Sequence, residues 1–143
     1  MTGKKHRILL PSYGERVDLP MAESSVPAGF PSPADDFIAN RLDLNEHLIL
    51  HPAATFFVRV AGDSMIGAGI TDGDILIVDR SLEPTDGRVV IAVISGELVV
   101  KRLRRTEKGW LLLAENDGYP PIEVGEEGEF EVWGVVTNVI HHL

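Results

Sequence analysis

A serine and a lysine occupy positions from which they could together cleave a peptide bond. Ser64 lies in the turn-like sequence Gly62-Asp63-Ser64-Met65, and Lys101 lies in the apolar run at residues 98–103. A serine hydroxyl is a weak nucleophile that needs a base beside it. A lysine can be that base when burial lowers its pKa and the amine becomes neutral. The two residues therefore predict Ser–Lys peptidase chemistry.

The sequence around Lys101 is consistent with a buried amine. In a strand, side chains alternate between two faces, so Val99 and Leu103 share the face of Lys101. Leu98 and Val100 fill the opposite face. An ammonium among apolar neighbours is costly, and loss of its proton removes that cost. The alternative is a lysine whose stem lies on apolar surface while its ammonium reaches water. The strand pattern leaves both interpretations open.

The turn around Ser64 also has two interpretations. Aspartate and serine beside glycine are common turn residues, because their side chains bond to nearby backbone. Gly-Asp-Ser also occurs in certain lipases and esterases, but their α/β domain requires alternating strands and helices, a pattern absent from this sequence. In the peptidase interpretation, the backbone N–H groups of Asp63 and Ser64 are the candidates for holding the developing oxyanion.

Other nucleophiles, bases and cofactors find little support in the sequence. The absence of cysteine excludes a thiolate nucleophile and a disulfide framework. The five histidines lie in the N-terminal arm, around residues 47–51 or at the C-terminus, away from the glycine turns between strands. His47 and His51 are four residues apart on an expected helix, but no His-Glu-x-x-His motif accompanies them. We therefore expect no metal and no other cofactor.

A candidate substrate lies upstream of both residues, at the bond between Ala28 and Gly29. Small residues on both sides of this bond fit a narrow cleft, and Val26 could occupy a shallow apolar pocket. Pro27 favours an extended backbone there. Mobile arms of this composition are common in proteins without any cleavage site, so the bond by itself does not distinguish a substrate from a linker.

The composition excludes several classes of protein. No run of about 18 apolar residues occurs, so no transmembrane helix is expected. The basic start at residues 1–7 is followed by only three apolar residues, too few for a signal peptide. We therefore expect a cytoplasmic protein without membrane contact. A net charge of −9 disfavours direct nucleic-acid binding, and the basic residues between 102 and 108 are interpreted as a solvated strand face.

The sequence predicts a flexible N-terminal arm, residues 1–33, followed by one domain, residues 34–143. Proline and serine deny the arm a helix or a paired central strand. Apolar residues at helical spacing predict one helix over residues 35–50. Strands with glycine-bearing turns are expected at residues 54–61, 75–78, 88–94, 98–103, 110–114 and 130–140. The expected fold is mostly β, a small curled antiparallel sheet of barrel-like form with one short helix.

Blocks of sequence from about Ala28 to the C-terminus resemble the UmuD proteins of bacterial SOS mutagenesis, in the LexA-like family of self-cleaving serine peptidases. The blocks occupy residues 29–34, 41–45, 51–58, 62–66, 69–70, 72–79, 99–103 and 130–136. The resemblance implies that Ser64 is the nucleophile, Lys101 the general base and Ala28-Gly29 the cleaved bond. UmuD proteins often have Cys-Gly at this bond, whereas LexA repressors have Ala-Gly. The helix-turn-helix of LexA repressors is missing, which disfavours a repressor.

The resemblance also implies partners. A RecA filament on single-stranded DNA would promote cleavage of the arm. The processed chain would form a homodimer and join a UmuC-like catalytic subunit in an error-prone translesion DNA polymerase. Two other classes remain: a signal-peptidase-like enzyme, which would require a membrane anchor, and a catalytically silent dimeric interaction module that regulates a polymerase. In the silent module, Ser64 and Lys101 would have structural roles only.

Overall fold

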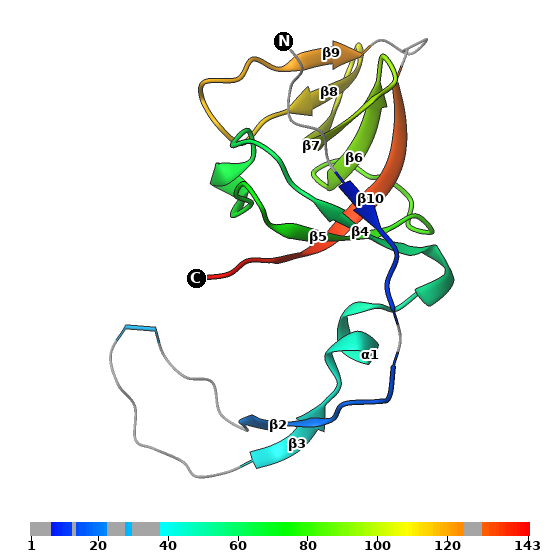
Figure 1. The fold of residues 1–143 in the computed structure, drawn as a ribbon. Coiled ribbons are helices and arrows are strands. Elements are labelled where there is room, and N and C mark those ends of the chain that lie inside the picture. The colour runs from blue at the N-terminus through cyan, green and yellow to red at the C-terminus, as the bar shows by residue number, and fades with distance from the viewer. Residues whose placement is uncertain (1–6, 13, 23–27, 30–37, 125–129) are drawn as a thin grey trace. The chain divides into compact units, whose positions relative to one another are not determined.

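The computed structural model describes residues 7–12, 14–22, 28–29, 38–124 and 130–143 of the chain (Figure 1). The chain divides into two compact units. One comprises Met1–Pro11 together with His51–Leu143, and the other comprises Ser12–Leu50. The boundary predicted between residues 33 and 34 lies outside the described residues.

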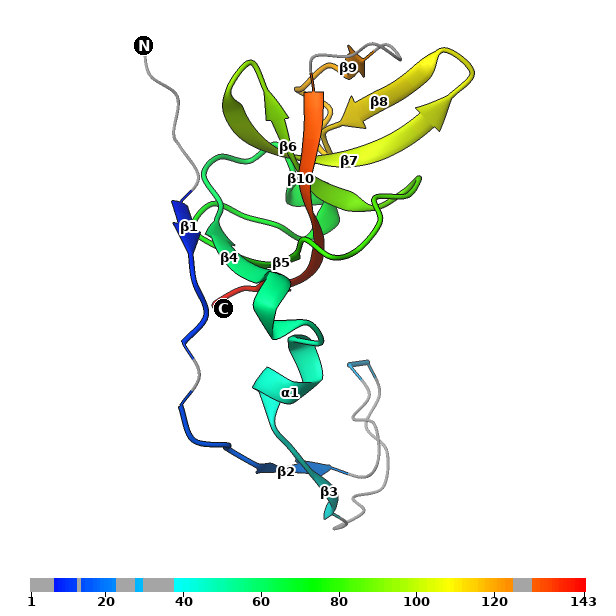
Figure 2. The same cartoon turned by 90° about the vertical axis from the view of Figure 1, so that its right-hand side faces the viewer.

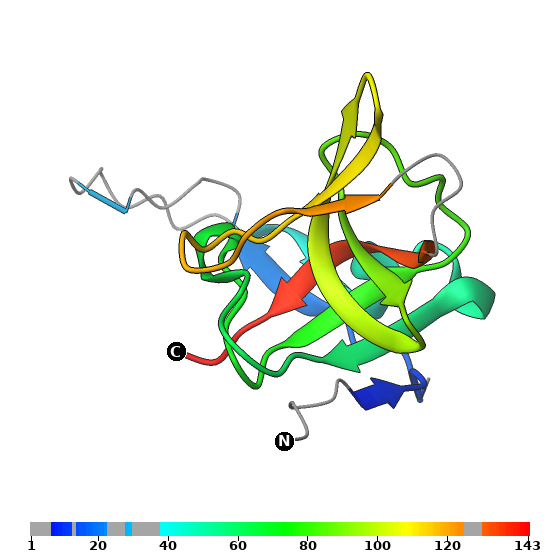
Figure 3. The same ribbon diagram turned by 90° about the horizontal axis from the view of Figure 1, so that it is seen from above.

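The larger unit is built on one antiparallel sheet of eight strands, ordered β1-β4-β5-β10-β6-β7-β8-β9. The strands are β1 (Arg7–Leu9), β4 (Thr55–Arg59), β5 (Ile75–Asp79), β6 (Val89–Ile94), β7 (Glu97–Thr106), β8 (Gly109–Leu113), β9 (Ile122–Val124) and β10 (Phe130–Ile140). The sheet is strongly curled, as the view from above shows (Figure 3). Its two end strands, β1 and β9, do not pair with each other, so the curl stays open. The predicted mostly β, curled antiparallel fold is confirmed.

A tight turn sets the register of the two strands that matter most for the site. Ser95 and Gly96 connect β6 to β7 and both have positive φ, 50° and 79°. Two consecutive residues of this kind are typical of the hairpin turns that match strand twist. The turn pairs Ile94 with Glu97, and counting along the ladder places Lys101 opposite Val90.

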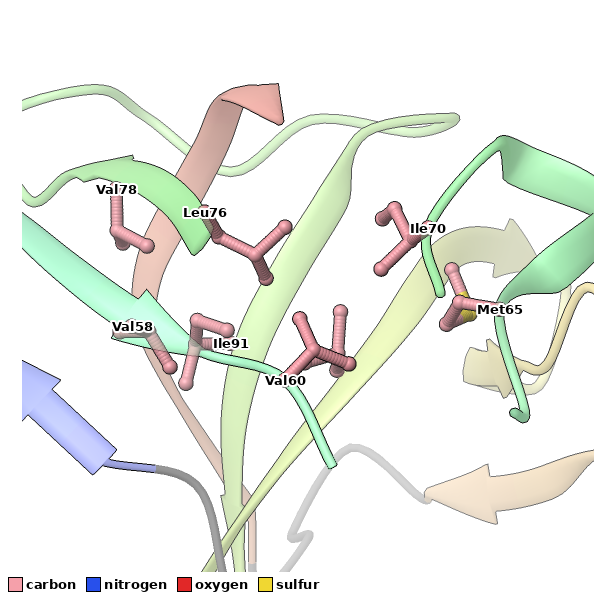
Figure 4. Close-up of a cluster of buried hydrophobic side chains, with 8 residues drawn as sticks. Val58, Val60, Met65, Ile70, Leu76, Val78 and Ile91 are labelled. Carbon is pink, nitrogen blue, oxygen red and sulfur yellow. The ribbon is translucent and has the colours of Figure 1, made fainter. Parts of the chain in front are cut away.

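Two buried clusters lie on opposite faces of the β6–β7 hairpin. Ile91 and Val100 belong to the first, whereas Val90 and Leu103 belong to the second. The first cluster, drawn in Figure 4, also contains Val58, Val60, Met65, Ile70, Leu76 and Val78. Full burial of one such side chain stabilises the fold by about 1.5–3 kcal/mol. The alternation predicted for β7 is confirmed, because its neighbouring residues pack into different clusters.

The smaller unit contains a two-stranded sheet and the only α-helix among the described residues (Figure 2). Strand β2 (Leu19–Ala22) pairs with β3 (Ile38–Leu42), and α1 (Leu44–Leu48) follows. Asp43 caps this helix, because its carboxylate accepts a hydrogen bond from the backbone N–H of Asn45 at 3.0 Å. None of the described helices is long and apolar enough to cross a membrane.

The predicted helix over residues 35–50 is wrong for most of its described length. Residues 38–42 form a strand, and the helix covers five residues. Backbone pairing with β2 overrides the local pattern, and the cap at Asp43 starts the helix late. Apolar residues of two successive elements had produced an apparent single helical period. Strands β1, β2 and β9 were also missed, each being only three or four residues long.

Candidate active site

Ser64 lies in a turn whose backbone is held by contacts on both sides of the serine. Gly62 has a φ of +95° and donates its N–H to Asp72 Oδ1 at 2.8 Å. On the other side Met65 is 2% exposed and belongs to the first buried cluster, and the 3₁₀ turn Ile66–Ala68 follows. Ser64 itself is partly exposed. The turn therefore combines a fixed backbone with a serine that solvent and substrate can reach.

Lys101 lies in the middle of β7 and is 8% exposed. Val100 beside it packs into the first buried cluster, as Met65 beside Ser64 does. Burial lowers the pKa of the Lys101 ammonium below its ordinary value. Among the described carboxylates none forms an ion pair with it. The structure thus favours the buried interpretation of this lysine over the one in which its ammonium extends into water.

The segment between β8 and β9 joins the serine turn to β7. The N–H of Glu115 donates to the carbonyl of Ser64 at 2.8 Å, and the N–H of Gly67 donates to the carbonyl of Glu115 at 2.7 Å. The carboxylate of Glu115 pairs with Arg102, the residue after Lys101. Gly67 has no room for a side chain, since an added Cβ would lie 2.6 Å from the Glu115 carbonyl oxygen. Glu115 therefore bonds to the backbone of the serine turn and also contacts β7 through Arg102.

The same segment supplies two more contacts. Asn116 Nδ2 donates to the carbonyl of Asp63 at 3.0 Å, and Tyr119 Oη donates to Asp63 Oδ1 at 2.5 Å. Lys101 Nζ lies 5.4 Å from the centre of the Tyr119 ring. The structure therefore brings Lys101 and the turn of Ser64 to one loop. In the part of the chain that is described, no direct hydrogen bond joins Ser64 Oγ to Lys101 Nζ.

The predicted oxyanion donors have no competing bonds. Of the backbone N–H groups in this turn, that of Gly62 is bound to Asp72 and that of Gly67 to Glu115. The N–H groups of Asp63 and Ser64 donate to no described residue. They remain the candidates for holding an oxyanion, a role that stays a prediction.

Comparison with known proteins identifies the family. The Peptidase S24-like family matches residues 20–137, a span that includes Ala28, Gly29, Ser64 and Lys101. The chain belongs to the Peptidase S24-like family.

Protein SamA of Salmonella typhimurium is 45% identical over 122 residues, covering 85% of this chain and 84% of SamA. Protein MucA of Escherichia coli is 41% identical over 126 residues, covering 87% and 86%. LexA repressor 1 of Pseudomonas syringae pv. tomato is 37% identical over 145 residues, covering 96% of this chain and 69% of the repressor. The predicted resemblance to UmuD and LexA proteins is confirmed.

The predicted substrate residues of this Peptidase S24-like chain are only partly described. Ala28 and Gly29 are exposed and belong to the Ser12–Leu50 unit. Val26 and Pro27 lie outside the described residues. The assignment of the Ala28-Gly29 bond as substrate therefore stays a prediction.

The histidines of this Peptidase S24-like domain have other partners. His51 Nδ1 lies 2.5 Å from Asp79 Oδ2, and His141 Nδ1 lies 2.7 Å from Asp74 Oδ1. His47 and His51 do not share a helix, because α1 ends at Leu48. Three or more metal-ligating side chains do not gather anywhere in the described ranges. These contacts give His51 and His141 structural roles and leave Lys101 as the candidate base.

Proposed function

We propose that this chain is a self-cleaving Ser–Lys peptidase of the SOS response, which removes its own N-terminal arm at Ala28-Gly29. The proposal is supported by the family and by the loop that contacts both the Ser64 turn and the buried Lys101. The Ser64 hydroxyl gains nucleophilicity only when a neutral amine accepts its proton. Burial of Lys101 favours the neutral amine.

In the proposed reaction, Ser64 Oγ attacks the carbonyl carbon of Ala28 while Lys101 Nζ accepts the hydroxyl proton. The N–H groups of Asp63 and Ser64 hold the oxyanion. The Lys101 ammonium then gives its proton to the amide nitrogen of Gly29 as the C–N bond breaks. Water then attacks the ester left on Ser64 while Lys101 takes a proton from it. Lys101 returns this proton to Ser64 Oγ as the ester bond breaks and the Ala28 carboxylate leaves. Attachment of substrate and enzyme in one chain raises their effective concentration, so modest reactivity suffices.

We further propose that the processed chain forms a homodimer and acts as the accessory subunit of a UmuC-like translesion polymerase. In the proposal a RecA filament promotes cleavage in the cytoplasm by stabilising the docked arm, a shift of population between conformations. Support for these partners comes from the resemblance to UmuD proteins. The second candidate function is a catalytically silent dimeric module in which Ser64 and Lys101 only support the fold.

Intact mass measured over hours at mildly alkaline pH tests the peptidase proposal. We expect release of residues 1–28 from the natural chain and none from Ser64→Ala or Lys101→Ala. Lys108→Ala is the matched control, because Lys108 is exposed at the β7–β8 turn and should leave cleavage unchanged. The rate should rise as the pH rises through the lowered pKa of Lys101, because the base works only as the neutral amine. An intact chain at every pH, with RecA filament present, would favour the silent module.

A further inference from the structure

The Tyr119 side chain contacts both Lys101 and Asp63, the residue before Ser64. Its hydroxyl bonds to the Asp63 carboxylate, and its ring faces the Lys101 ammonium. We infer that Tyr119 is a positioning residue of the self-cleavage reaction, anchored by Asp63, and that it fixes Lys101 relative to Ser64. This inference rests on the proposed peptidase function.

The position of Tyr119 is set by a closed ring of hydrogen bonds. Asn116 Nδ2 donates to the Asp63 carbonyl at 3.0 Å, and the Tyr119 N–H donates to the Asn116 carbonyl at 3.1 Å. The ring closes where Tyr119 Oη donates to Asp63 Oδ1 at 2.5 Å. Asn116 Oδ1 also accepts from the N–H of Gly118, which shapes the turn that leads to Tyr119. A shift of Tyr119 would therefore shift Asp63, and with it the adjoining Ser64.

Lys101 needs such a partner because its own side chain is flexible. Four rotatable bonds separate its amine from the backbone, and no described carboxylate pairs with it. The Tyr119 ring, centred 5.4 Å from Lys101 Nζ, limits the directions in which the lysine side chain can turn. The tyrosine residue is 42% exposed and Lys101 is 8% exposed, so the ring is more accessible to solvent than the lysine that it contacts. It therefore both orients the amine and limits its contact with water.

The hydroxyl and the ring of Tyr119 have different roles, which two substitutions distinguish. Tyr119→Phe keeps the ring but loses the bond to Asp63, so the amine is less well placed yet still shielded. Misplacement of a catalytic group by about 1 Å can cost about 100-fold in rate, and a loosened anchor should cost less, about 3–10-fold. Tyr119→Ala removes the shield as well, which favours the hydrated ammonium. Its cleavage rate should fall further and should require higher pH.

A double-mutant cycle over a range of pH tests the inference. The first-order cleavage rate is measured for the natural chain, Tyr119→Phe, Asp63→Ala and the double variant. We expect the double variant to be no slower than the slower single variant, because both substitutions break one contact. Tyr119→Phe should lower the rate at every pH without moving the rising limb of the pH profile, whereas Tyr119→Ala should move that limb to higher pH. If Tyr119 only supported the fold, the rising limb of the pH profile would stay in place in both Tyr119→Phe and Tyr119→Ala.

Trp110→Leu is the matched control, because its ring faces Arg105 at 4.8 Å and not Lys101. It should leave the rate and the pH profile unchanged. Additive losses in the cycle, or natural rates and profiles in both Tyr119 variants, would overturn the inference. A second measurement does not depend on cleavage: in a Ser64→Ala background, the ring-current shift of the Lys101 methylene protons is followed by NMR. Its presence in Ser64→Ala and its loss in Ser64→Ala/Tyr119→Ala is expected, and no shift would contradict the contact even if the peptidase proposal failed.

Discussion

The two units of the chain differ in what holds them together. In the unit that contains His51–Leu143, two clusters of side chains are almost completely buried around β6 and β7. In the Ser12–Leu50 unit, Ile49 is the only buried apolar side chain among those described. Val17, Leu19 and Met21 there are more than half exposed. One unit is stabilised by core packing, and the other by backbone pairing and a helix cap.

This difference matches the two roles that the peptidase proposal requires. A nucleophile and a base must keep their spacing, and buried neighbours such as Met65 and Val100 provide that. A substrate segment must change conformation to be cut, and segments with few buried contacts open at low free-energy cost. The ion pairs of Arg16 with Asp18 and Glu46 are exposed, and such pairs add little stability. Under the peptidase proposal, one short chain joins a rigid catalytic part to an adaptable substrate part.

The largest expected effect is the difference in unfolding free energy when a leucine is replaced by alanine in each of the two units. Leu76 is completely buried and Leu19 is 56% exposed. Leu76→Ala should lower the free energy of unfolding by about 2–5 kcal/mol, because it leaves a cavity. Leu19→Ala should change it by less than about 0.5 kcal/mol. Urea unfolding of both variants in a Ser64→Ala background measures the difference. Equal losses would show that the Ser12–Leu50 unit has a packed core after all.

A second pair compares two aspartates. Asp79 is 4% exposed, and although burial alone would raise its pKa, hydrogen bonds from Ser81 and His51 lower it. This contribution to stability is present above the ordinary pKa of about 3.9 and is lost as the pH falls through the lowered value. Asp79→Asn should cost about 1–3 kcal/mol at neutral pH. Asp18→Asn, which breaks an exposed pair, should cause no measurable loss.

Unfolding measured at several pH values checks this second comparison. The difference between Asp79→Asn and the natural residue should shrink toward acid pH, where the natural carboxylate becomes protonated. A constant difference over the whole pH range would mean that the charge of Asp79 has no part in its stabilising effect.

Replacement of buried Lys101 should stabilise the fold, whereas replacement of buried Asp79 should destabilise it. Its pKa is lowered by burial in the folded chain, so the unfolded chain binds the proton more tightly and stability rises with pH. Lys101→Met keeps the side-chain length without the charge and should stabilise the fold by about 1 kcal/mol at neutral pH. The gain should shrink once the pH passes the lowered pKa and should vanish near the ordinary lysine pKa of about 10.4. Thermal unfolding against pH measures it, with exposed Lys108→Met as control. A destabilised Lys101→Met would show that the ammonium has a favourable partner.

The strands of the larger unit were the predictable part of the fold. Residues 88–94 and 98–103 are rich in β-branched and leucine residues, and Ser95-Gly96 between them is a local hairpin signal. Strands β2 and β3 were not predictable, because each is short and gains its structure from pairing with the other across about 20 residues of sequence. Tertiary pairing of this kind leaves no periodic pattern within either segment.

The candidate site divides in the same way. Ser64 and Lys101 could be named as candidates from sequence because the resemblance to UmuD and LexA proteins adds to local features that leave both roles open by themselves. Glu115, Asn116 and Tyr119 were missed, since they act through bonds to residues 48 to 56 positions away in the chain. The only local signal was the turn sequence Asn116-Asp117-Gly118, which indicates a bend but not what the bend holds. Residues proposed to position a site are thus harder to predict than the candidates for its nucleophile and base.

The smallest expected effect concerns removal of the arm itself. Cleavage after Ala28 would detach β1 and β2. Strand β1 pairs only with Phe57, Val58 and Arg59 of β4, and β2 pairs only with β3. A few backbone hydrogen bonds contribute about 1 kcal/mol each, and the entropy of ordering the segment offsets them. The free energy of unfolding of the processed chain should therefore lie within about 1 kcal/mol of that of intact Ser64→Ala.

Hydrogen exchange should nevertheless quicken in β4 and stay unchanged in β6 and β7, since local pairing protects only neighbouring amides. A loss of several kcal/mol, or faster exchange throughout the sheet, would mean that residues 1–28 help to stabilise the packed sheet. In that case the contrast between packed enzyme and adaptable substrate would fail where the two are joined.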